Sequence, residues 1–184
     1  MDSTAAAADA FPELDEIEDD DLRARVVAAW ATALEENDVD DVAALPWFPP
    51  AQRKHDITGE TLVGHVRDVV RGSLALADSL VDSRGADVDC DLVVAAALVH
   101  DIGKVYEFDG YDDTAVGRLV GHPYYGVHPV AAAGLPAAYA HVVLSHTDRT
   151  PVEPAFLEAV IVKRADEAAA AAIRATALDD LRDA

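Results

Sequence analysis

Apolar residues recur every three to four positions along most of the chain, which is the spacing of helices that bury one face. This repeat is clear over residues 22–36 and 61–81, and the segment DLVVAAALVHD at 91–101 is apolar almost all round. A helix of that kind is buried, so 91–101 is predicted to lie in the core. No convincing run of alternating residues predicts strands. We therefore expect an all-α bundle of about six to eight helices.

The remaining segments set the expected organisation. Residues 1–20 are small and acidic without a visible apolar repeat, which predicts a disordered tail. Residues 21–50 are expected to form a helical extension that ends at the proline-rich stretch LPWFPP, and 51–184 the main domain. Inside it, EFDGYDD predicts a polar loop, 116–126 and 136–146 predict one short helix each, and a final helix is expected from 156 to 184.

The strongly negative net charge limits the conditions and the binding partners that suit this protein. The chain carries 35 acidic and 14 basic residues, a net charge of −21, and its lysines are Lys54, Lys104 and Lys163. Such self-repulsion is screened in molar salt, where the Debye length is about 3 Å, so we expect a halophilic, haloarchaeal protein. An ordinary acidic protein is the alternative. Because nucleic-acid binding depends on Lys and Arg, a long nucleic acid is not expected to bind without a partner protein.

Other compositional features limit the class of protein. No run of 18 or more apolar residues predicts a membrane helix, and the N-terminal stretch lacks the basic start and apolar core of a signal peptide. We therefore expect a cytoplasmic protein. The only cysteine, Cys90, excludes an internal disulfide and a zinc cage built from cysteines.

The dipeptide His100-Asp101 at the end of the apolar segment is the main candidate for chemistry. Burying an imidazole beside a carboxylate costs several kcal/mol unless a partner such as a divalent cation compensates. Adjacent helical side chains diverge by about 100°, so the two residues suit two neighbouring metals, with the carboxylate spanning both. Further ligands would have to come from other helices, and His65, His122, His146 and Asp166 each lie on a separate predicted element.

The order H…HD…H…H…D resembles the HD-domain superfamily of metal-dependent phosphohydrolases. The segments KHDITGETLVGHV, LVVAAALVHDIGKVYEF, VGRLVGHPYYG, HVVLSHTD and EAVIVKRADEAAAA are similar to the HD domain of bacterial 3′–5′ exoribonucleases of the CMP-binding-factor type. The similarity covers about residues 51–175. An isolated HD pair is common, whereas HDIGK after an apolar helix with this downstream order is specific.

The resemblance implies an HD-domain helical bundle with two divalent metal ions. His65, His100, Asp101 and Asp166 would hold the first ion, with Asp101 bridging, and His122 and His146 would complete the second site. Imidazole with carboxylate suits Mn, Fe, Co, Ni or Zn better than Mg. Lys104, three residues past Asp101, is expected to stabilise charge on a phosphoryl group, so Asp101 and Lys104 are the predicted catalytic residues.

The predicted activity is hydrolysis of a phosphoester in a nucleotide or short oligonucleotide, with a metal-bridging hydroxide as the nucleophile. Weaker candidates for binding this small phosphorylated substrate are His55, Arg118 and Arg149. The chain departs from the exoribonucleases because it lacks their OB-type module and has Thr147-Asp148 where they have a second His and Gly. Two alternatives stay open: an exonuclease that acts with a separate OB-fold partner, and a non-catalytic nucleotide-sensing module.

Overall fold

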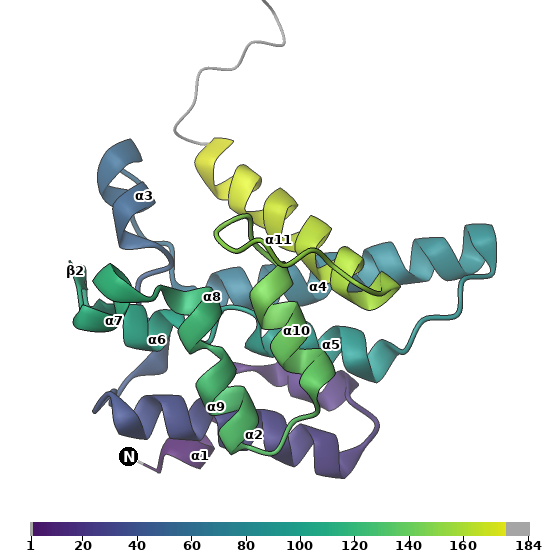
Figure 1. Cartoon of the computed structure of the whole chain (residues 1–184), viewed down its shortest axis with the longest axis horizontal. Helices are drawn as coiled ribbons and strands as arrows, with labels where there is room; N and C mark the ends of the chain where they lie inside the picture. The colour runs from purple at the N-terminus through teal and green to yellow at the C-terminus, as the bar shows by residue number, and fades with distance from the viewer. Residues whose placement is uncertain (1, 176–184) are drawn as a thin grey trace, which may run out of the picture.

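The structure, a computed structural model, describes residues 2–175, and nearly all of its regular structure is helical. The elements follow in the order α1 (Ser3–Ala10), η1 (Pro12–Glu16), α2 (Asp20–Glu36), η2 (Val42–Ala44), α3 (Pro49–His55), α4 (Leu62–Arg84), α5 (Cys90–Val99), α6 (Lys104–Glu107), β1 (Phe108–Asp109), β2 (Asp112–Asp113), α7 (Ala115–Leu119), α8 (His122–Tyr125), α9 (Val127–Ala132), α10 (Ala137–Ser145) and α11 (Leu157–Ala175). The predicted all-α class is confirmed, and Figure 1 shows the bundle with the end of α4 extending beyond it.

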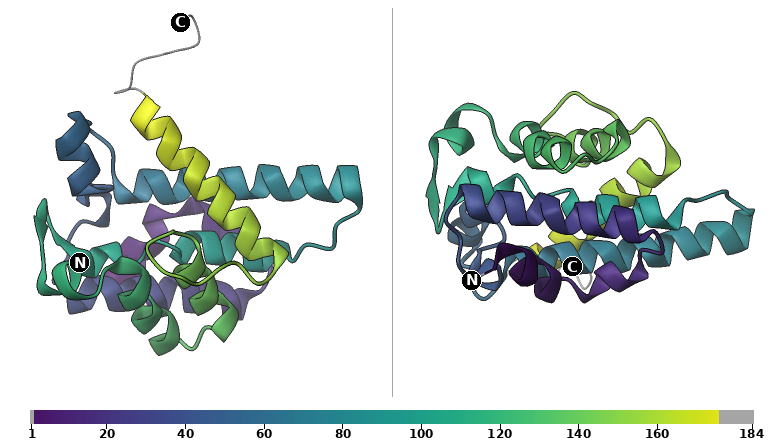
Figure 2. Two further views of the ribbon diagram at one scale, coloured as in Figure 1. Left: turned by 45° about the horizontal axis from the view of Figure 1, so that its top comes forward. Right: turned by 90° about the horizontal axis from the view of Figure 1, so that it is seen from below.

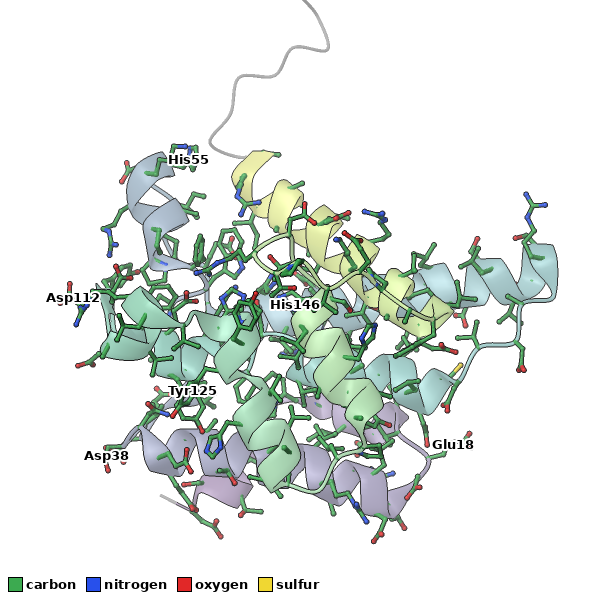
Figure 3. The ribbon with its side chains drawn as sticks, viewed as in Figure 1. Glu18, Asp38, His55, Asp112, Tyr125 and His146 are labelled. Atoms are coloured by element: carbon green, nitrogen blue, oxygen red, sulfur yellow. The ribbon has the colours of Figure 1, made fainter. Side chains whose placement is uncertain are left out.

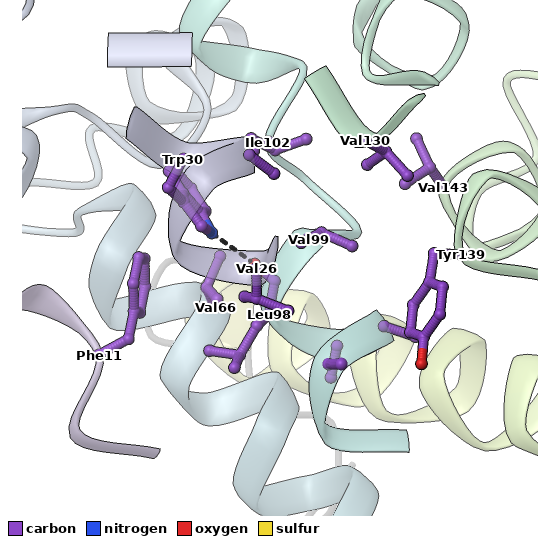
Figure 4. Packing of buried hydrophobic residues seen from close by; sticks show 14 of the residues in the cluster. Phe11, Val26, Trp30, Val66, Leu98, Val99, Ile102, Val130, Tyr139 and Val143 are labelled. Carbon is purple, nitrogen blue, oxygen red and sulfur yellow. Dashed lines mark hydrogen bonds between the residues drawn. The ribbon is translucent and has the colours of Figure 1, made fainter. Parts of the chain in front are cut away.

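Helix α5 is the centre of the hydrophobic core. All its residues from 93 to 99 are buried, and it packs against α2, α4, α10 and α11. The Asp89 carboxylate caps its first turn by accepting the N–H of Leu92 at 3.0 Å. Near its other end, the Trp30 indole N–H donates to the carbonyl of Leu98 at 3.0 Å (Figure 4). The helix therefore holds the residues that follow it, His100 and Asp101, inside the bundle.

The two long helices α4 and α11 cross closely over the core, as Figure 2 shows. Thr61 caps the start of α4 through its hydroxyl, and Gly85 ends the helix with a left-handed φ of 61°. The two helices pack closely at Gly72, where a built Cβ would lie 3.4 Å from the Cβ of Ala165 on α11. The crossing brings His65 of α4 near Asp166 of α11.

The expectation of a disordered tail over residues 1–20 is wrong. Residues 3–16 form α1 and η1, and Ala7, Phe11, Leu14 and Ile17 are buried against the core. The Phe11 and Trp30 rings lie 4.8 Å apart. These four residues are spaced as on a helix, but the acidic residues between them hide the repeat at the level of composition.

Polar contacts also tie this N-terminal segment to the bundle. The carboxylate of Glu13 accepts from Arg67 at 2.9 Å and from Arg71 at 3.1 Å, both on α4. The carboxylate of Asp91 accepts the backbone N–H groups of Glu18 and Asp19 at 2.8 and 2.9 Å. Acidic side chains therefore help to fix a segment whose charge had suggested disorder.

Several short elements replace the longer ones that the sequence predicted. The prolines after Phe48 start α3, since Pro is well accommodated in the first turn of a helix. The expected loop at 107–113 contains a two-stranded hairpin with Phe108 opposite Asp113. The helix expected over 116–126 is divided into α7 and α8 at Gly121, whose φ is 85°. Local breaks of this kind explain why the helices are more numerous and shorter than expected.

The last helix, α11, starts at Leu157, close to the predicted start. Its expected continuation over 176–184 lies outside the described residues. Within residues 2–175, no helix combines the length and the apolar character needed to cross a membrane.

Candidate metal centre

The structure brings the six predicted metal ligands together from five parts of the chain. His65 lies in the first turns of α4, His100 and Asp101 follow α5, His122 starts α8, His146 follows α10, and Asp166 lies on α11. Figure 3 shows His146 near the middle of the view, close to α10, which packs against α8 and α11. All six side chains are buried except Asp166, whose side chain is 17% exposed.

These residues form two groups that share one carboxylate. One group contains His65, His100, Asp101 and Asp166, and the other contains Asp101, His122 and His146; in each, the ligand atoms all lie within 4.8 Å of one another. Histidine nitrogens and carboxylate oxygens gathered at such distances are typical ligands of divalent transition-metal ions.

The two oxygens of Asp101 face different groups. Its Oδ2 lies 3.3 Å from His65 Nε2 and 3.4 Å from His100 Nε2. Its Oδ1 lies 3.4 Å from His122 Nε2 and 3.5 Å from His146 Nε2. A carboxylate with one oxygen in each group has the placement of a bridging ligand.

Buried polar atoms without hydrogen bonds indicate that this donor set suits metal ions. Among the described residues, Nε2 of His100 and both ring nitrogens of His65 have no hydrogen-bond partner. His65 Nε2 is only 3.0 Å from Asp166 Oδ1, yet the two atoms are not aligned as a hydrogen bond. Leaving such groups unpaired is costly, and a cation between them would remove the cost.

Three of the histidines are oriented through their other ring nitrogen. Nδ1 of His100 lies 2.6 Å from the carbonyl oxygen of Ala97, and Nδ1 of His146 lies 2.8 Å from that of Val143. A carbonyl only accepts, so each Nδ1 carries the proton and each Nε2 keeps a free lone pair toward the centre. His122 is held in the same way, by the carboxylate of Glu107 at 2.6 Å.

Glu107 is a functional candidate that the sequence analysis missed. It is 2% exposed and also accepts from Arg149 Nη2 at 2.7 Å. Arg149 Nη1 lies 2.9 Å from His122 Nδ1, but that nitrogen donates to Glu107 and cannot also accept. The sequence feature that could have revealed it is a single glutamate between Tyr106 and Phe108, three residues after Lys104 of HDIGK.

Burial and neighbouring charges shift several pKa values in the centre. Burial lowers the pKa of His122 to about 4, which keeps its imidazole neutral near pH 7. Burial raises the pKa of Glu107, but His122 and Arg149 outweigh it and lower the net value. Burial likewise opposes the ionisation of Asp166, yet His65 and His100 lower its pKa to about 2.

The pKa values of Asp101 and His65 reflect their mutual proximity. Burial alone would raise the pKa of Asp101, but Lys104 and His100 hold it well below its ordinary value. For His65, burial lowers the pKa, whereas the carboxylates of Asp101 and Asp166 raise it to a net value above the usual one. The centre therefore presents two carboxylates as anions.

The glycine of the HDIG segment, Gly103, is required because the backbone passes very close to another part of the chain there. A Cβ at this position would lie 2.1 Å from the carbonyl oxygen of His122 and 2.9 Å from the backbone nitrogen of Gly126. Both are backbone atoms, which cannot move aside as a flexible side chain can. Only glycine therefore lets the chain after Asp101 pass close enough to α8 for His122 to reach the centre.

A pocket opens onto the centre. Its polar lining consists of Asp101, Lys104, His122, His146, Thr147, Arg149 and Asp166. The rest of its lining, which we call the aromatic wall, consists of Trp47, Phe48, Ala170 and Arg174. The ammonium of Lys104 lies 2.5 Å from Asp101 Oδ2 and 5.4 Å from the centre of the Phe48 ring, so it joins the two parts.

The weaker substrate candidates are not all placed at the pocket. Arg149 lines it, whereas His55 and Arg118 do not. His55 lies at the end of α3, well away from His146 in Figure 3. Arg118 on α7 is exposed and donates to the carbonyl of Asp113.

Comparison with known proteins agrees with this geometry. The family described as the HD domain matches residues 62–171, which include every ligand of both groups. The chain belongs to the HD-domain family. A dihydroneopterin 2′,3′-cyclic phosphate phosphodiesterase of Methanocaldococcus jannaschii is 30% identical over 161 residues, which make up 84% of this chain and 65% of that protein. No solved structure matches the chain significantly.

Membership gives the clustered residues a chemical context. HD domains bind divalent metals, and this HD domain has a buried histidine and carboxylate cluster that could hold them. The narrower resemblance to the exoribonuclease branch and the halophilic origin stay predictions.

Proposed function

We propose that this HD domain is a metal-dependent phosphodiesterase that acts on a small phosphorylated molecule. The placement of Asp101 is the observation that supports this proposal most strongly. One of its oxygens faces His65 and His100, and the other faces His122 and His146. That arrangement supports two adjacent ion sites with a shared carboxylate, which is the general architecture of two-metal phosphoester hydrolysis.

The two groups described above are the proposed ligand sets. His65, His100, Asp101 and Asp166 would hold one ion, and Asp101, His122 and His146 would hold the other. Bound divalent ions at such a site polarise the phosphoryl oxygens and activate a water molecule as nucleophile. The nitrogen-rich set favours Mn, Fe, Co, Ni or Zn over Mg.

Two basic side chains, Lys104 and Arg149, are proposed to bind the phosphoryl group. Lys104 is 7% exposed and its ammonium lies at the boundary between the centre and the pocket. A desolvated ammonium there would stabilise charge that develops on the phosphoryl oxygens. Arg149 lines the same pocket and is fixed by Glu107, so its guanidinium is already oriented to donate to phosphate oxygens.

A cyclic phosphodiester is the substrate class we favour. The relative from Methanocaldococcus jannaschii is named for a 2′,3′-cyclic phosphate, although this chain spans only 65% of its length. The net charge of −21 argues against tight binding of a long nucleic acid, whose phosphates would be repelled. A small, singly charged cyclic phosphate needs only the local cations of the pocket.

Metal analysis combined with a substrate panel tests this proposal. Wild-type protein, His100→Ala and the control His141→Ala would be purified in molar salt and analysed for bound metal. His141 is a suitable control because its ring lies outside both ligand groups and accepts the N–H of Ala155 at 3.0 Å. We expect wild type and His141→Ala to bind about two ions and His100→Ala to lose metal.

The same three proteins, loaded with Mn²⁺, would be assayed on 2′,3′-cyclic nucleotides, bis-p-nitrophenyl phosphate, nucleoside monophosphates and a 3′-labelled oligonucleotide. We expect cleavage of the cyclic and model diesters by wild type and the control, with loss in His100→Ala. Preferential trimming of the oligonucleotide would replace this proposal with the exonuclease. Tight nucleotide binding without any product would replace it with a sensing module.

A further inference from the structure

The aromatic wall differs in chemistry from the rest of the pocket. Trp47, Ala51, Ile57, Ala170 and Ile173 form a small hydrophobic cluster of their own, with Phe48 packed on it. This cluster joins the start of α3 to the end of α11 beside the metal centre. The pocket therefore has polar groups suited to a phosphate and, next to them, an apolar surface that a phosphate would not use.

Arg174 is the cation of this wall. Its guanidinium carbon lies 5.2 Å from the centre of the Trp47 ring, within the range of a cation–π contact. Among residues 2–175 no carboxylate forms an ion pair with it, although the chain has 35 acidic residues. A guanidinium is planar, and Arg174 lines the pocket, so this group can stack on a flat ligand.

The wall also has an unused hydrogen-bond donor. Trp47 is 2% exposed, and its indole Nε1–H is buried without a partner among the described residues. The indole itself offers little surface for stacking, because His65, Phe48, Lys104 and Arg174 all contact it. The surfaces left for a ligand are the half-buried Phe48 ring and the guanidinium of Arg174.

We infer that the aromatic wall binds a planar heteroaromatic ring of the substrate, with Phe48 and Arg174 as specificity-determining residues. This inference rests on the proposed function, since it assigns the non-phosphate part of the same substrate. Stacking on an aromatic ring and on a guanidinium does not depend on one particular base. The wall would thus select ring-bearing phosphates over ringless ones.

Calorimetric binding to the metal-loaded full chain tests this without requiring turnover. Guanosine 3′-monophosphate and glycerol 3-phosphate serve as probes, because both carry a phosphomonoester and only the first carries a heteroaromatic ring. Loss of one stacking contact weakens binding by about 5- to 100-fold. We expect wild type to bind the guanosine probe at least about tenfold more tightly than the glycerol probe.

The variants separate ring stacking from charge and from folding. Phe48→Leu keeps apolar volume without a flat ring, and Arg174→Lys keeps the charge without a flat guanidinium. Each should reduce affinity for the guanosine probe by about 5- to 100-fold and change that for the glycerol probe much less. Phe156→Ala, which removes a half-buried ring that packs on His141 away from the pocket, should alter neither affinity.

Equal affinities for the two probes in wild type, or an unchanged preference in both wall variants, would overturn the inference. An equal fall for both probes in Arg174→Lys would assign the guanidinium to the phosphate, which both probes carry, and would also overturn it. The proposed function fails in a different way, namely if no phosphodiester is cleaved while the preference for the guanosine probe persists.

Discussion

The two ligand groups of the centre are supported in different ways. All members of the first group lie on or just after α4, α5 and α11, and His65 on the long helix α4 has no hydrogen bond to either ring nitrogen among the described residues. In the second group, His122 starts the four-residue helix α8 and is held by Glu107, which Arg149 holds in turn. A ligand on a long packed helix needs little side-chain support, whereas a ligand on a short helix depends on a polar scaffold.

Removing Asp101, the ligand that both groups share, should disable both ion sites and give the largest loss of activity. In Asp101→Asn, both groups lose their common anion while the side-chain shape is kept. We expect kcat/KM on a cyclic phosphodiester to fall by at least about 10³-fold and both ions to be lost. Metal analysis and steady-state assays measure this. Retention of one tightly bound ion in the variant would argue against a shared carboxylate.

Gly103→Ala should damage the second group through the backbone. The added Cβ would lie 2.1 Å from the carbonyl of His122, so α8 must move. We expect the free energy of unfolding to fall by roughly 3 kcal/mol and affinity for one ion to be lost. Urea unfolding and metal titration check these two outcomes. A normal second ion in a folded Gly103→Ala protein would contradict the role assigned to the glycine.

In the metal-free protein, lowering the pH should destabilise the fold through His122 of the second group. The pKa of His122 is about 4 in the fold and 6.5 ordinarily, so the unfolded chain takes up the proton first as the pH falls. Its contribution to stability is present above pH 6.5 and is lost between pH 6.5 and 4, with a magnitude of up to about 3 kcal/mol. Unfolding of chelator-treated wild type and His122→Gln across this range should show a shallower pH dependence in the variant. Parallel curves would show that His122 is not the group responsible.

Glu107→Gln should give the smallest loss of function and should separate the two ion sites most clearly. The amide keeps an acceptor for His122 but replaces the charge that Arg149 binds. We expect affinity for one ion to fall about 10- to 100-fold while the other is unchanged, since outer ligand partners typically contribute that much. Competitive Mn²⁺ titration can resolve the two ions. An equal loss of both would mean that the groups are not supported independently.

The sequence predicted the parts of the molecule that depend on periodic patterns. The apolar run at 93–99, the helix containing His65 and the final helix with Asp166 all have the expected positions. The convergence of the six candidate ligands was expected from their order along the chain and from the family resemblance. Five of the six ligands follow or lie on α4, α5, α10 and α11, whose buried faces the apolar pattern reveals, whereas His122 starts the short helix α8.

What the sequence did not predict depends on contacts between distant residues. Glu107 and Phe48 approach the centre from segments that composition describes only as polar or proline-rich, and Arg174 comes from the final helix, whose apolar pattern did not single it out. The N-terminal residues 3–17 looked disordered because their charge is obvious, whereas the partners of that charge, such as Arg67 for Glu13, lie on α4. Tertiary contacts of this kind override a local reading of charge.

Electron paramagnetic resonance of the Mn²⁺-loaded protein tests the central claim most directly. If Asp101 bridges two adjacent sites, as its oxygens indicate, wild type should bind about two Mn²⁺ ions and show an exchange-coupled dimanganese spectrum. The spectrum should disappear in Asp101→Asn. A six-line spectrum of isolated Mn²⁺ at full loading, unchanged in the variant, would contradict the account.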